Sequence, residues 1–327
     1  MSVNKKAKAV VLISGGLDSI ISAILLKKQN IQVYGIYFYS PFFGDRELIK
    51  RVSKQIKIPI KQVEIDKEYL KLLKKPKHGF GKNINPCIDC KIYMLKKAKQ
   101  YMKQINAHFI ATGEVLEQRP MSQHRKALNI IEKESGLKGI LLRPLSAQYL
   151  VKTKPEKESL VERIHLYNIR GRGRNVQLDL ANKLKLTEYK SPAGGCKLTD
   201  INYADKVRDL LKYNKKIEVK DFLILKYGRH FRFGKNKIIV GRHEKDNKIL
   251  IRLKNKNEYI FEVPGHGSPL TILQGPLTKD SIELAASLTA KYADCQDNLV
   301  LVKYGKKLEK SIYINKASED LIKKLKV

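Results

Sequence analysis

The chain has 327 residues, 43% of them hydrophobic, which is enough to bury cores in two or three domains. No apolar run reaches the length of a membrane span and the first residues form no signal-peptide pattern, so we expect a cytoplasmic protein without a membrane partner. The 66 Lys and Arg residues against 32 Asp and Glu give a charge of +34, which favours nucleic acid as the partner because neutralised phosphates release counterions. A lysine-rich host or a hot habitat would produce the same excess.

The first predicted strand, residues 9–13, runs directly into a glycine-containing loop and a predicted helix over residues 20–26. The loop consists of Ser14, Gly15, Gly16, Leu17, Asp18 and Ser19. A strand that breaks at glycines into a helix presents N–H groups and a positive dipole end to an anion. We expect this loop to bind the pyrophosphate part of ATP, with Asp18 as a catalytic Mg²⁺ contact; an ordinary tight turn is the alternative. It lacks the lysine of the Gly-x-x-x-x-Gly-Lys-Ser/Thr loop, which favours AMP transfer over γ-phosphoryl transfer.

Strand-like and helix-like segments continue to alternate as far as residue 145. Strands are predicted over 31–38, 59–65 and 107–113, and helices over 45–55 and 91–104. This alternation predicts an α/β domain over residues 1–145 with an open parallel sheet, whose ligands bind at the carboxyl ends of the strands. Tyr37, Thr112 and Gly113 fall at such ends and are predicted to border the nucleotide. Glu114 either borders the nucleotide too or caps a helix.

Four cysteines in a cytoplasmic chain favour metal or sulfur chemistry over disulfides. Cys87 and Cys90 form a Cys-x-x-Cys pair in a predicted loop before a helix, and Cys196 follows Gly194 and Gly195. Three thiolates could hold a [4Fe-4S] cluster and leave its fourth iron open to exogenous sulfide. Zinc with a histidine or Cys295 as fourth ligand is a second interpretation, and a persulfide on Cys87 or Cys90, resolved by Cys196, is a third. Cys295 itself has the neighbours of a buried or incidental thiol.

Residues 146–210 are predicted to form a small helical lobe that contributes Cys196 and covers the nucleotide site. Arg170, Arg172 and Arg174 alternate with glycines, which suits a flexible clamp on RNA phosphates. Arg119, Gln123 and Arg143 are further candidates for contact with RNA or phosphate, with surface salt bridges as the alternative.

Residues 211–327 are predicted to form a separate α+β domain with short alternating runs, among them 237–240 and 248–252, and a helix over 282–292. Phosphate contacts are predicted for four basic residues of this domain, Arg229, Arg232, Arg242 and Lys245. Tyr227, Phe231 and His266 are predicted to stack on unpaired bases, against the alternative of a solvated basic face over core aromatics.

Residues 10–200 resemble the PP-loop enzymes that thiolate tRNA, notably the 2-thiouridine and 4-thiouridine synthetases. The resemblance rests on residues 14–19, 81–90, 112–123 and 194–196. It implies an adenine nucleotide alpha hydrolase-like fold, use of ATP and Mg²⁺, adenylation of a uridine carbonyl and replacement of its oxygen by sulfur. In cluster-dependent members the positions of Cys87, Cys90 and Cys196 are catalytic and bind a [4Fe-4S] cluster. Residues 1–327 differ from the best known cluster-dependent group in having no flanking zinc-finger cysteines, and they show no obvious THUMP-like pattern before the first strand.

The carboxyl-terminal region is similar to the RNA-binding region of the NFACT group, through residues 239–247, 264–269, 282–292 and 302–304. Together the two resemblances imply tRNA and a sulfur donor as partners, the donor being sulfide, a persulfide or a carrier protein. We also count a second copy of the chain, in a homodimer, among the candidate partners. The competing functions are PP-loop amide or amine ligation, sulfur transfer to a small molecule, and RNA binding by a protein with a degenerate nucleotide site.

Overall fold

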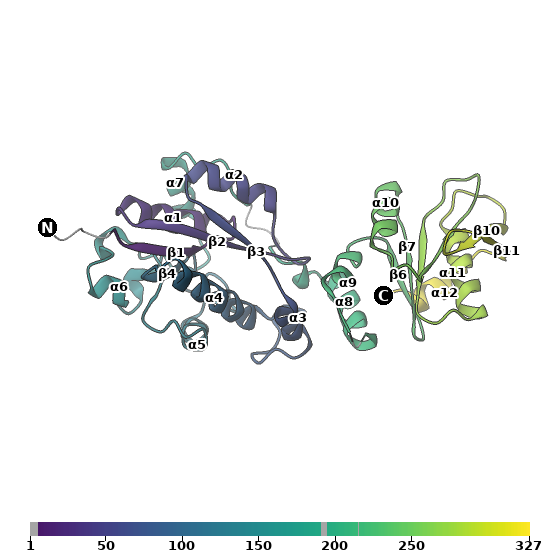
Figure 1. The fold of residues 1–327 in the computed structure, drawn as a ribbon, viewed down its shortest axis with the longest axis horizontal. Helices are drawn as coiled ribbons and strands as arrows, with labels where there is room; N and C mark the ends of the chain where they lie inside the picture. The colour runs from purple at the N-terminus through teal and green to yellow at the C-terminus, as the bar shows by residue number, and fades with distance from the viewer. Residues whose placement is uncertain (1–5, 191–194, 215) are drawn as a thin grey trace. The chain divides into compact units, whose positions relative to one another are not determined.

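The computed structural model describes residues 6–190, 195–214 and 216–327, which divide into two compact units, residues 1–199 and 200–327 (Figure 1). Gly194, part of the motif before Cys196, lies outside the described residues. The sequence-based boundaries at residues 145 and 210 stay predictions. Within the described ranges no helix is both long and apolar enough to cross a membrane.

The first unit is built on a five-stranded parallel sheet, as predicted, with the strand order β3-β2-β1-β4-β5. Its strands are β1 (Lys8–Leu12), β2 (Gln32–Tyr39), β3 (Ile60–Glu64), β4 (Phe109–Thr112) and β5 (Leu141–Leu142). The loop after β1 and the residues after β4 therefore lie at the same edge of the sheet, because these two neighbouring strands run in parallel.

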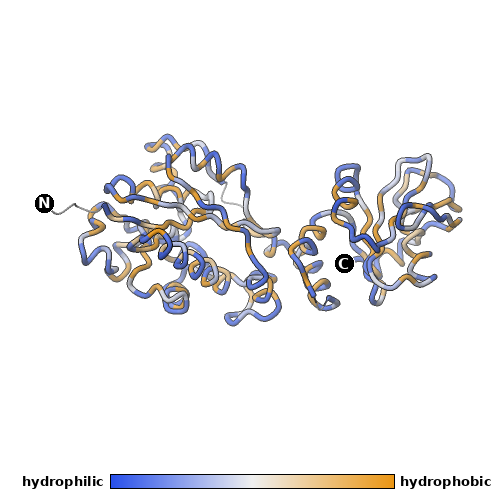
Figure 2. Tube along the Cα trace, viewed as in Figure 1, coloured by the Kyte–Doolittle hydropathy of each residue, from blue (hydrophilic) through white to orange (hydrophobic). Residues whose placement is uncertain are grey.

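Helices cover both faces of this sheet. They are α1 (Leu17–Lys28), α2 (Arg46–Ile56), α3 (Lys67–Lys74), α4 (Cys87–Gln104) and α5 (Arg125–Glu134). Alternate residues of β1 point to opposite faces, so Val11 packs with α1 and α2, whereas Val10 packs with α4 and α5. In Figure 2 hydrophobic stretches follow the interior of each unit and hydrophilic residues dominate the outer turns.

Among the described residues after β5, the first unit contains short helices and no further strand. They are η1 (Ala147–Tyr149), α6 (Lys154–Lys157), η2 (Arg163–His165), α7 (Asn175–Lys183) and η3 (Lys197–Thr199). Leu180 and Ala181 of α7 pack into one hydrophobic cluster with Leu17 and Ile21 of α1. This contact places α7 against the helix that follows the glycine loop.

The second unit is a six-stranded antiparallel sheet with helices, which confirms the predicted α+β domain. The strand order is β11-β10-β8-β9-β7-β6. Its strands are β6 (Arg229–Phe233), β7 (Asn236–Val240), β8 (Tyr259–Glu262), β9 (Thr271–Gln274), β10 (Leu299–Gly305) and β11 (Lys310–Asn315). Its helices are α8 (Ile201–Tyr213), α9 (Val219–Ile224), α10 (Glu244–Leu253), α11 (Lys279–Lys291) and α12 (Glu319–Leu325). The core lies between the sheet and α11, whose Leu284 and Leu288 are buried.

Two local predictions are wrong. Residues 248–252 are not an alternating strand but lie in α10, whose amino terminus is capped by the His243 side chain on the Asp246 N–H group. Only Leu250 of the apolar run is fully buried, as expected of a helix with one face against the core. Cys87 and Cys90 lie in the first turn of α4 and not in a preceding loop, because Pro86 stands at the N-cap and helical hydrogen bonding begins immediately after it.

Candidate nucleotide and thiol site

The glycine loop at the end of β1 is held open by its own serines. The Ser14 N–H group donates to Ser19 Oγ at 3.1 Å, and the Ser19 hydroxyl donates to the Gly16 carbonyl at 2.8 Å. Gly15 has a φ of +80°, a conformation that side chains with a Cβ rarely adopt. No side chain caps the start of α1 at Gly16. The loop therefore presents an uncapped helix start, which suits an oxyanion.

Asp18 carries a buried carboxylate oxygen, Oδ1, that has no hydrogen-bond partner among the described residues. The other oxygen, Oδ2, lies 3.7 Å from Arg174 Nη2. A carboxylate oxygen without a donor is the kind of ligand that Mg²⁺ takes. The residues at this point fit the predicted magnesium contact.

Gly113, just after β4, lies directly against this loop. A Cβ atom at Gly113 would collide with the backbone of Asp18 and Ser19, so only glycine lets the strand end approach the loop this closely. The Thr112 hydroxyl donates to Glu114 Oε2 at 3.0 Å. Gly113 thus lies against the loop, and contact of Thr112, Gly113 and Glu114 with the nucleotide stays a prediction. Tyr37 is buried, and its hydroxyl accepts the Asp45 N–H group at the start of α2.

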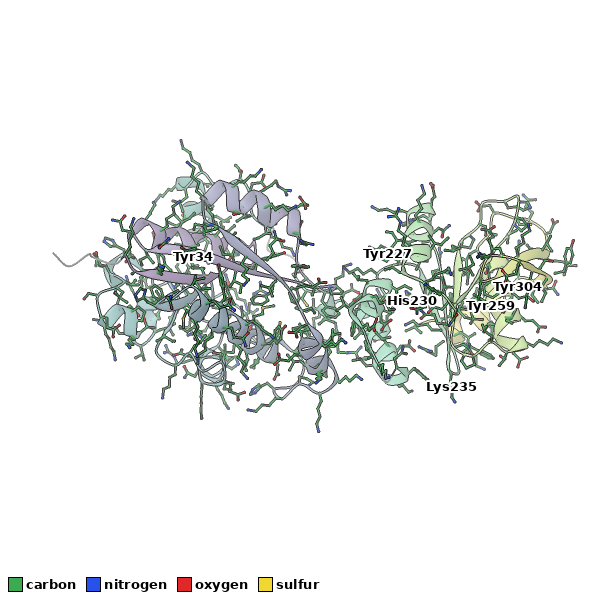
Figure 3. The ribbon with its side chains drawn as sticks, in the orientation of Figure 1. Tyr34, Tyr227, His230, Lys235, Tyr259 and Tyr304 are labelled. Atoms are coloured by element: carbon green, nitrogen blue, oxygen red, sulfur yellow. The ribbon has the colours of Figure 1, made fainter. Side chains whose placement is uncertain are left out.

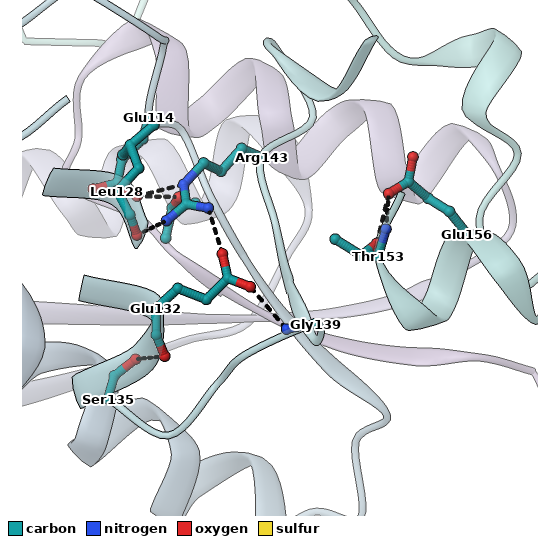
Figure 4. A network of polar contacts seen from close by, with 9 residues as sticks. Glu114, Leu128, Glu132, Ser135, Gly139, Arg143, Thr153 and Glu156 are labelled. Atoms are coloured by element: carbon teal, nitrogen blue, oxygen red, sulfur yellow. Dashed lines mark hydrogen bonds and ion pairs between the residues drawn. The ribbon is translucent and has the colours of Figure 1, made fainter. Parts of the chain in front are cut away.

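Glu114 is the centre of a buried network of charges (Figure 4). Arg143 Nε lies 3.1 Å from Glu114 Oε2, and its Nη1 lies 3.1 Å from Glu132 Oε2. Burial by itself would raise the pKa of Glu114, but Lys91 and Arg143 outweigh it and hold that pKa below its usual value. With 4% of its side chain exposed, Arg143 is neither the RNA contact nor the surface salt bridge predicted for it. Its guanidinium group is paired with the carboxylates of Glu114 and Glu132.

Lys91 connects the nucleotide edge of the sheet with the cysteines. Its Nζ lies 3.7 Å from Glu114 Oε1, an oxygen with no hydrogen-bond partner in the described structure. Lys91 directly follows Cys90 in the first turns of α4, and its charge acts on the Cys90 thiol. A short chain of contacts therefore runs from the glycine loop through Gly113, Glu114 and Lys91 to Cys90.

The thiols of Cys87, Cys90 and Cys196 lie near one another. Burial raises the pKa of Cys90 to about 11, with Cys87 adding to the shift, and burial raises the pKa of Cys196 to about 12, with both other cysteines adding to it. Asn85 Nδ2 donates to Cys87 Sγ at 2.9 Å. Lys190 also reaches the glycine loop, because its N–H group donates to the Gly15 carbonyl at 2.7 Å. The nucleotide and thiol sites therefore adjoin each other.

Tyr69 is a site residue that sequence reasoning missed. Its hydroxyl donates to Cys90 Sγ at 3.4 Å, and its side chain is fully buried. Burial raises the pKa of Tyr69 well above its ordinary value, and all three cysteines add to that rise. The spacing of Tyr69, Leu70 and Leu73 in α3 marks a buried helix face, but it carries no signal that cysteines lie beyond that face.

In residues 6–190, 195–214 and 216–327, no three His, Cys, Asp or Glu side chains form a group that could hold a metal ion. Cys295 belongs to the second unit, where it packs at the edge of the core. Its Sγ lies 3.8 Å from Asp297 Oδ2. Since the two units are not placed relative to each other, Cys295 has no assigned role at the thiol site.

The arginines predicted to clamp RNA in the first unit have different surroundings. Arg174 contacts Asp18, whereas the Arg170 guanidinium lies over the Tyr149 ring, 5.2 Å from its centroid. Arg119 and Arg172 are exposed. Gln123 is buried with its Oε1 unpartnered in the described structure.

Several predicted RNA contacts of the second unit are engaged in ion pairs. Both Nε and Nη2 of Arg232 donate to Asp209 at 2.7 Å, and Arg242 Nε donates to Asp246 at 2.7 Å. Arg229 lies over the Tyr292 ring, whereas Lys245 is exposed.

The aromatic residues predicted to stack on bases also differ. Phe231 is fully buried, so the prediction that it stacks on bases is wrong; it points from β6 into the core. Tyr227 is partly exposed, and its carbonyl contacts the ring of the buried His230. Both residues are labelled in Figure 3. His266 is exposed.

Comparison with known families identifies the protein family that the first unit matches. The family described as thiamine biosynthesis protein (ThiI) matches residues 4–172, more than half of the chain. The chain belongs to the ThiI family. In this ThiI-family chain the matched range includes the glycine loop, Glu114, Cys87 and Cys90. The NFACT protein RNA binding domain matches residues 228–325, which covers the antiparallel sheet of the second unit.

Curated relatives resemble only part of the chain. The tRNA-specific 2-thiouridylase MnmA of Karelsulcia muelleri (strain GWSS) is 31% identical over 135 residues, covering 37% of this chain and 34% of the relative. The probable tRNA sulfurtransferase of Thermococcus kodakarensis is 28% identical over 156 residues, covering 44% and 38%. The chain thus spans well under half the length of these two relatives. A solved 4-thiouridine synthetase–RNA complex with bound ATP matches at 18% identity over 55% of this chain and 50% of that one, with a TM-score of 0.37, too low to support an argument.

Proposed function

We propose that this chain is an ATP-dependent tRNA sulfurtransferase that adenylates a uridine carbonyl and replaces its oxygen with sulfur. The observation that carries the proposal is the continuity of the two sites. The glycine loop touches Gly113, Glu114 follows Gly113, and Lys91 joins Glu114 to Cys90 within one unit. An adenylating loop beside three thiols is the arrangement that sulfur insertion needs. Membership of the ThiI family and the names of the two relatives support it.

In the first step, a uracil carbonyl oxygen attacks the α-phosphorus of ATP, and the bond to the β-phosphate breaks. The uncapped start of α1 and the loop N–H groups would hold the departing pyrophosphate. Asp18 would hold Mg²⁺ through its unpartnered oxygen. In the second step, sulfide attacks the ring carbon, the carbon–oxygen bond breaks and AMP leaves. The Lys91 ammonium would stabilise negative charge between the two sites.

The donor set of the thiol site supports an iron–sulfur cluster on Cys87, Cys90 and Cys196. Three cysteine thiols suit iron–sulfur ligation, and when bound such a cluster would offer a fourth iron that can take exogenous sulfide. A tetrahedral zinc ion would need sulfurs only about 3.8 Å apart, whereas cysteines on separate irons stand further apart. Zinc with a histidine or Cys295 as fourth ligand stays the alternative, and the metal content of the purified chain decides between the two.

The high pKa values also bear on the persulfide alternative. With a pKa of about 11 for Cys90 and about 12 for Cys196, both free thiols stay protonated at neutral pH and are poor nucleophiles. A bound metal would remove those protons. The high pKa values of Cys90 and Cys196 thus weigh against a persulfide on Cys90 that Cys196 resolves.

The test is thiolation by the full chain, purified without oxygen and assayed for iron and sulfide. With ATP, Mg²⁺, sulfide and unmodified tRNA, we expect thiouridine in the nucleosides and release of AMP and pyrophosphate. Cys87→Ala, Cys90→Ala and Cys196→Ala should each lower thiolation at least about hundredfold, while ATP binding stays within twofold.

Cys295→Ala is the matched control and should thiolate like the wild type. Full activity in any of the three site variants would refute the three-cysteine assignment. If all three variants still released pyrophosphate when tRNA was added and formed an amine or amide product, PP-loop ligation would replace the sulfur proposal.

A further inference from the structure

The facing sides of α1 and α7 contain buried polar atoms that have no partner in the described structure. They are Asp18 Oδ1, Ser22 Oγ, Arg174 Nε and both amide atoms of Gln177. Buried polar atoms in proteins nearly always have a hydrogen-bond partner, so several of them on one pair of helices need an explanation. A bound polar ligand or ordered water would supply it.

Arg174 and Gln177 lie on the side of α7 that faces α1. Arg174 is the N-cap residue of α7, and its guanidinium reaches Asp18 at 3.7 Å. Gln177 has no exposed surface, and Ala181, one turn further along, packs with Leu17 of α1. Residues 174, 177 and 181 follow the spacing of a single helix face. The Gln177 amide is therefore buried beside the contact between Arg174 and Asp18.

Both helices begin without a side-chain cap. No side-chain hydrogen bond caps α1 at Gly16 or α7 at Arg174. Each helix start carries partial positive charge, and Arg174 adds a full charge between them. Asp18, the acid that Arg174 contacts, also has the oxygen suited to Mg²⁺. If Asp18 held Mg²⁺, the Arg174 guanidinium would be free to bind phosphate oxygens in a bidentate manner.

We propose that Arg174 and Gln177, at the start of α7, form the second half of the phosphate site for ATP and bind its pyrophosphate part. The identity of ATP as the ligand rests on the proposed function. This role differs from the one predicted from the sequence, in which Arg174 clamps RNA phosphates together with Arg170 and Arg172. Its partner is a phosphate of the nucleotide, and RNA contact is the competing assignment.

The test measures binding to the full chain in the presence of Mg²⁺, without RNA or sulfide. Arg174→Ala should weaken binding of ATP and of inorganic pyrophosphate tenfold or more, and should leave AMP binding within twofold. Lys183→Ala is the matched control, because Lys183 is an exposed cation at the far end of the same helix. It should bind all three ligands like the wild type. The proposal fails if Arg174→Ala binds ATP as the control does and loses affinity for tRNA instead.

Gln177→Leu tests the buried amide with little change in volume. We expect ATP and pyrophosphate to bind severalfold more weakly, while the melting temperature stays the same or rises, because an unpartnered amide is removed from the interior. Unchanged ATP affinity with a raised melting temperature would show that the Gln177 amide binds only water, and would overturn the role of Gln177.

These measurements separate the inference from the proposed function. A chain that binds ATP through Arg174 but does not thiolate tRNA would keep the inference and refute the function. A chain that thiolates tRNA with an unaffected Arg174→Ala variant would do the reverse. A chain that binds neither ATP nor pyrophosphate would overturn both.

Discussion

The two units treat buried polar side chains differently. All but one of the buried side-chain atoms without a hydrogen-bond partner in the described structure belong to the first unit, and the exception is His230 Nδ1. In the second unit the buried Asp209 is held by Arg232 and by Lys237, whose Nζ lies 3.0 Å away. In the first unit, by contrast, unpartnered atoms of Asp18, Arg174 and Gln177 coincide with the proposed phosphate site.

Among the substitutions that test this difference between the units, we expect Asp18→Asn to have the largest effect on activity. Asp18→Asn removes the negative charge proposed to hold Mg²⁺, so tRNA-dependent pyrophosphate release should fall at least about hundredfold. The melting temperature should change little, because Oδ1 makes no hydrogen bond in the described structure. Pyrophosphate release within threefold of the wild type would exclude a metal role for Asp18.

A large effect on stability is expected at Arg143. Arg143→Met removes the cation that bonds to the buried Glu114 and leaves that carboxylate with the Thr112 hydroxyl and with Lys91, whose Nζ is 3.7 Å away, so unfolding of the first unit should become easier by about 3–5 kcal/mol. Arg232→Met is the comparison in the second unit, where Lys237 still bonds to Asp209. We expect it to cost less. Urea denaturation of both variants checks this order. Equal losses in the free energy of unfolding would contradict the idea that Lys237 compensates for Arg232 while Lys91 does not compensate for Arg143.

The smallest effect is expected at Lys245, which is exposed on α10 and shows no ion pair among the described residues. If the second unit binds tRNA through its surface, Lys245→Ala should weaken tRNA binding a few-fold and lower the slope of log affinity against log salt by about one. Its unfolding should match the wild type. Unchanged affinity and slope would remove Lys245 from the RNA contacts.

The sequence predicts the scaffold of the first unit well because periodicity and strand ends are local signals. The apolar runs before Ser14 and Gly113 place both at the carboxyl edge of a parallel sheet, and the structure confirms that the Gly113 strand end touches the glycine loop. The triplet of cysteines is likewise recognisable from residue type, although the Cys-x-x-Cys pair begins a helix instead of preceding one.

Tertiary contacts between distant segments carry no such signal. Arg143 and Arg232 look like surface cations in the sequence, yet each meets a buried carboxylate from another element. Tyr69 reads as one apolar position of an amphipathic helix, and nothing local indicates its contact with Cys90. The apolar run over 248–252 fits a strand by composition. The His243 cap and the burial of Leu250 alone are instead typical of a helix with one face against the core.

The contact between Gly113 and the glycine loop has a mechanical consequence. Because the backbone of β4 rests on the backbone of Asp18 and Ser19 with no side chain between them, folding of the sheet also fixes the loop. The conformational entropy of the glycine loop is thus lost during folding and not when the nucleotide binds. Amide hydrogen exchange should find loop and strand opening together, as one cooperative segment, even in the nucleotide-free protein.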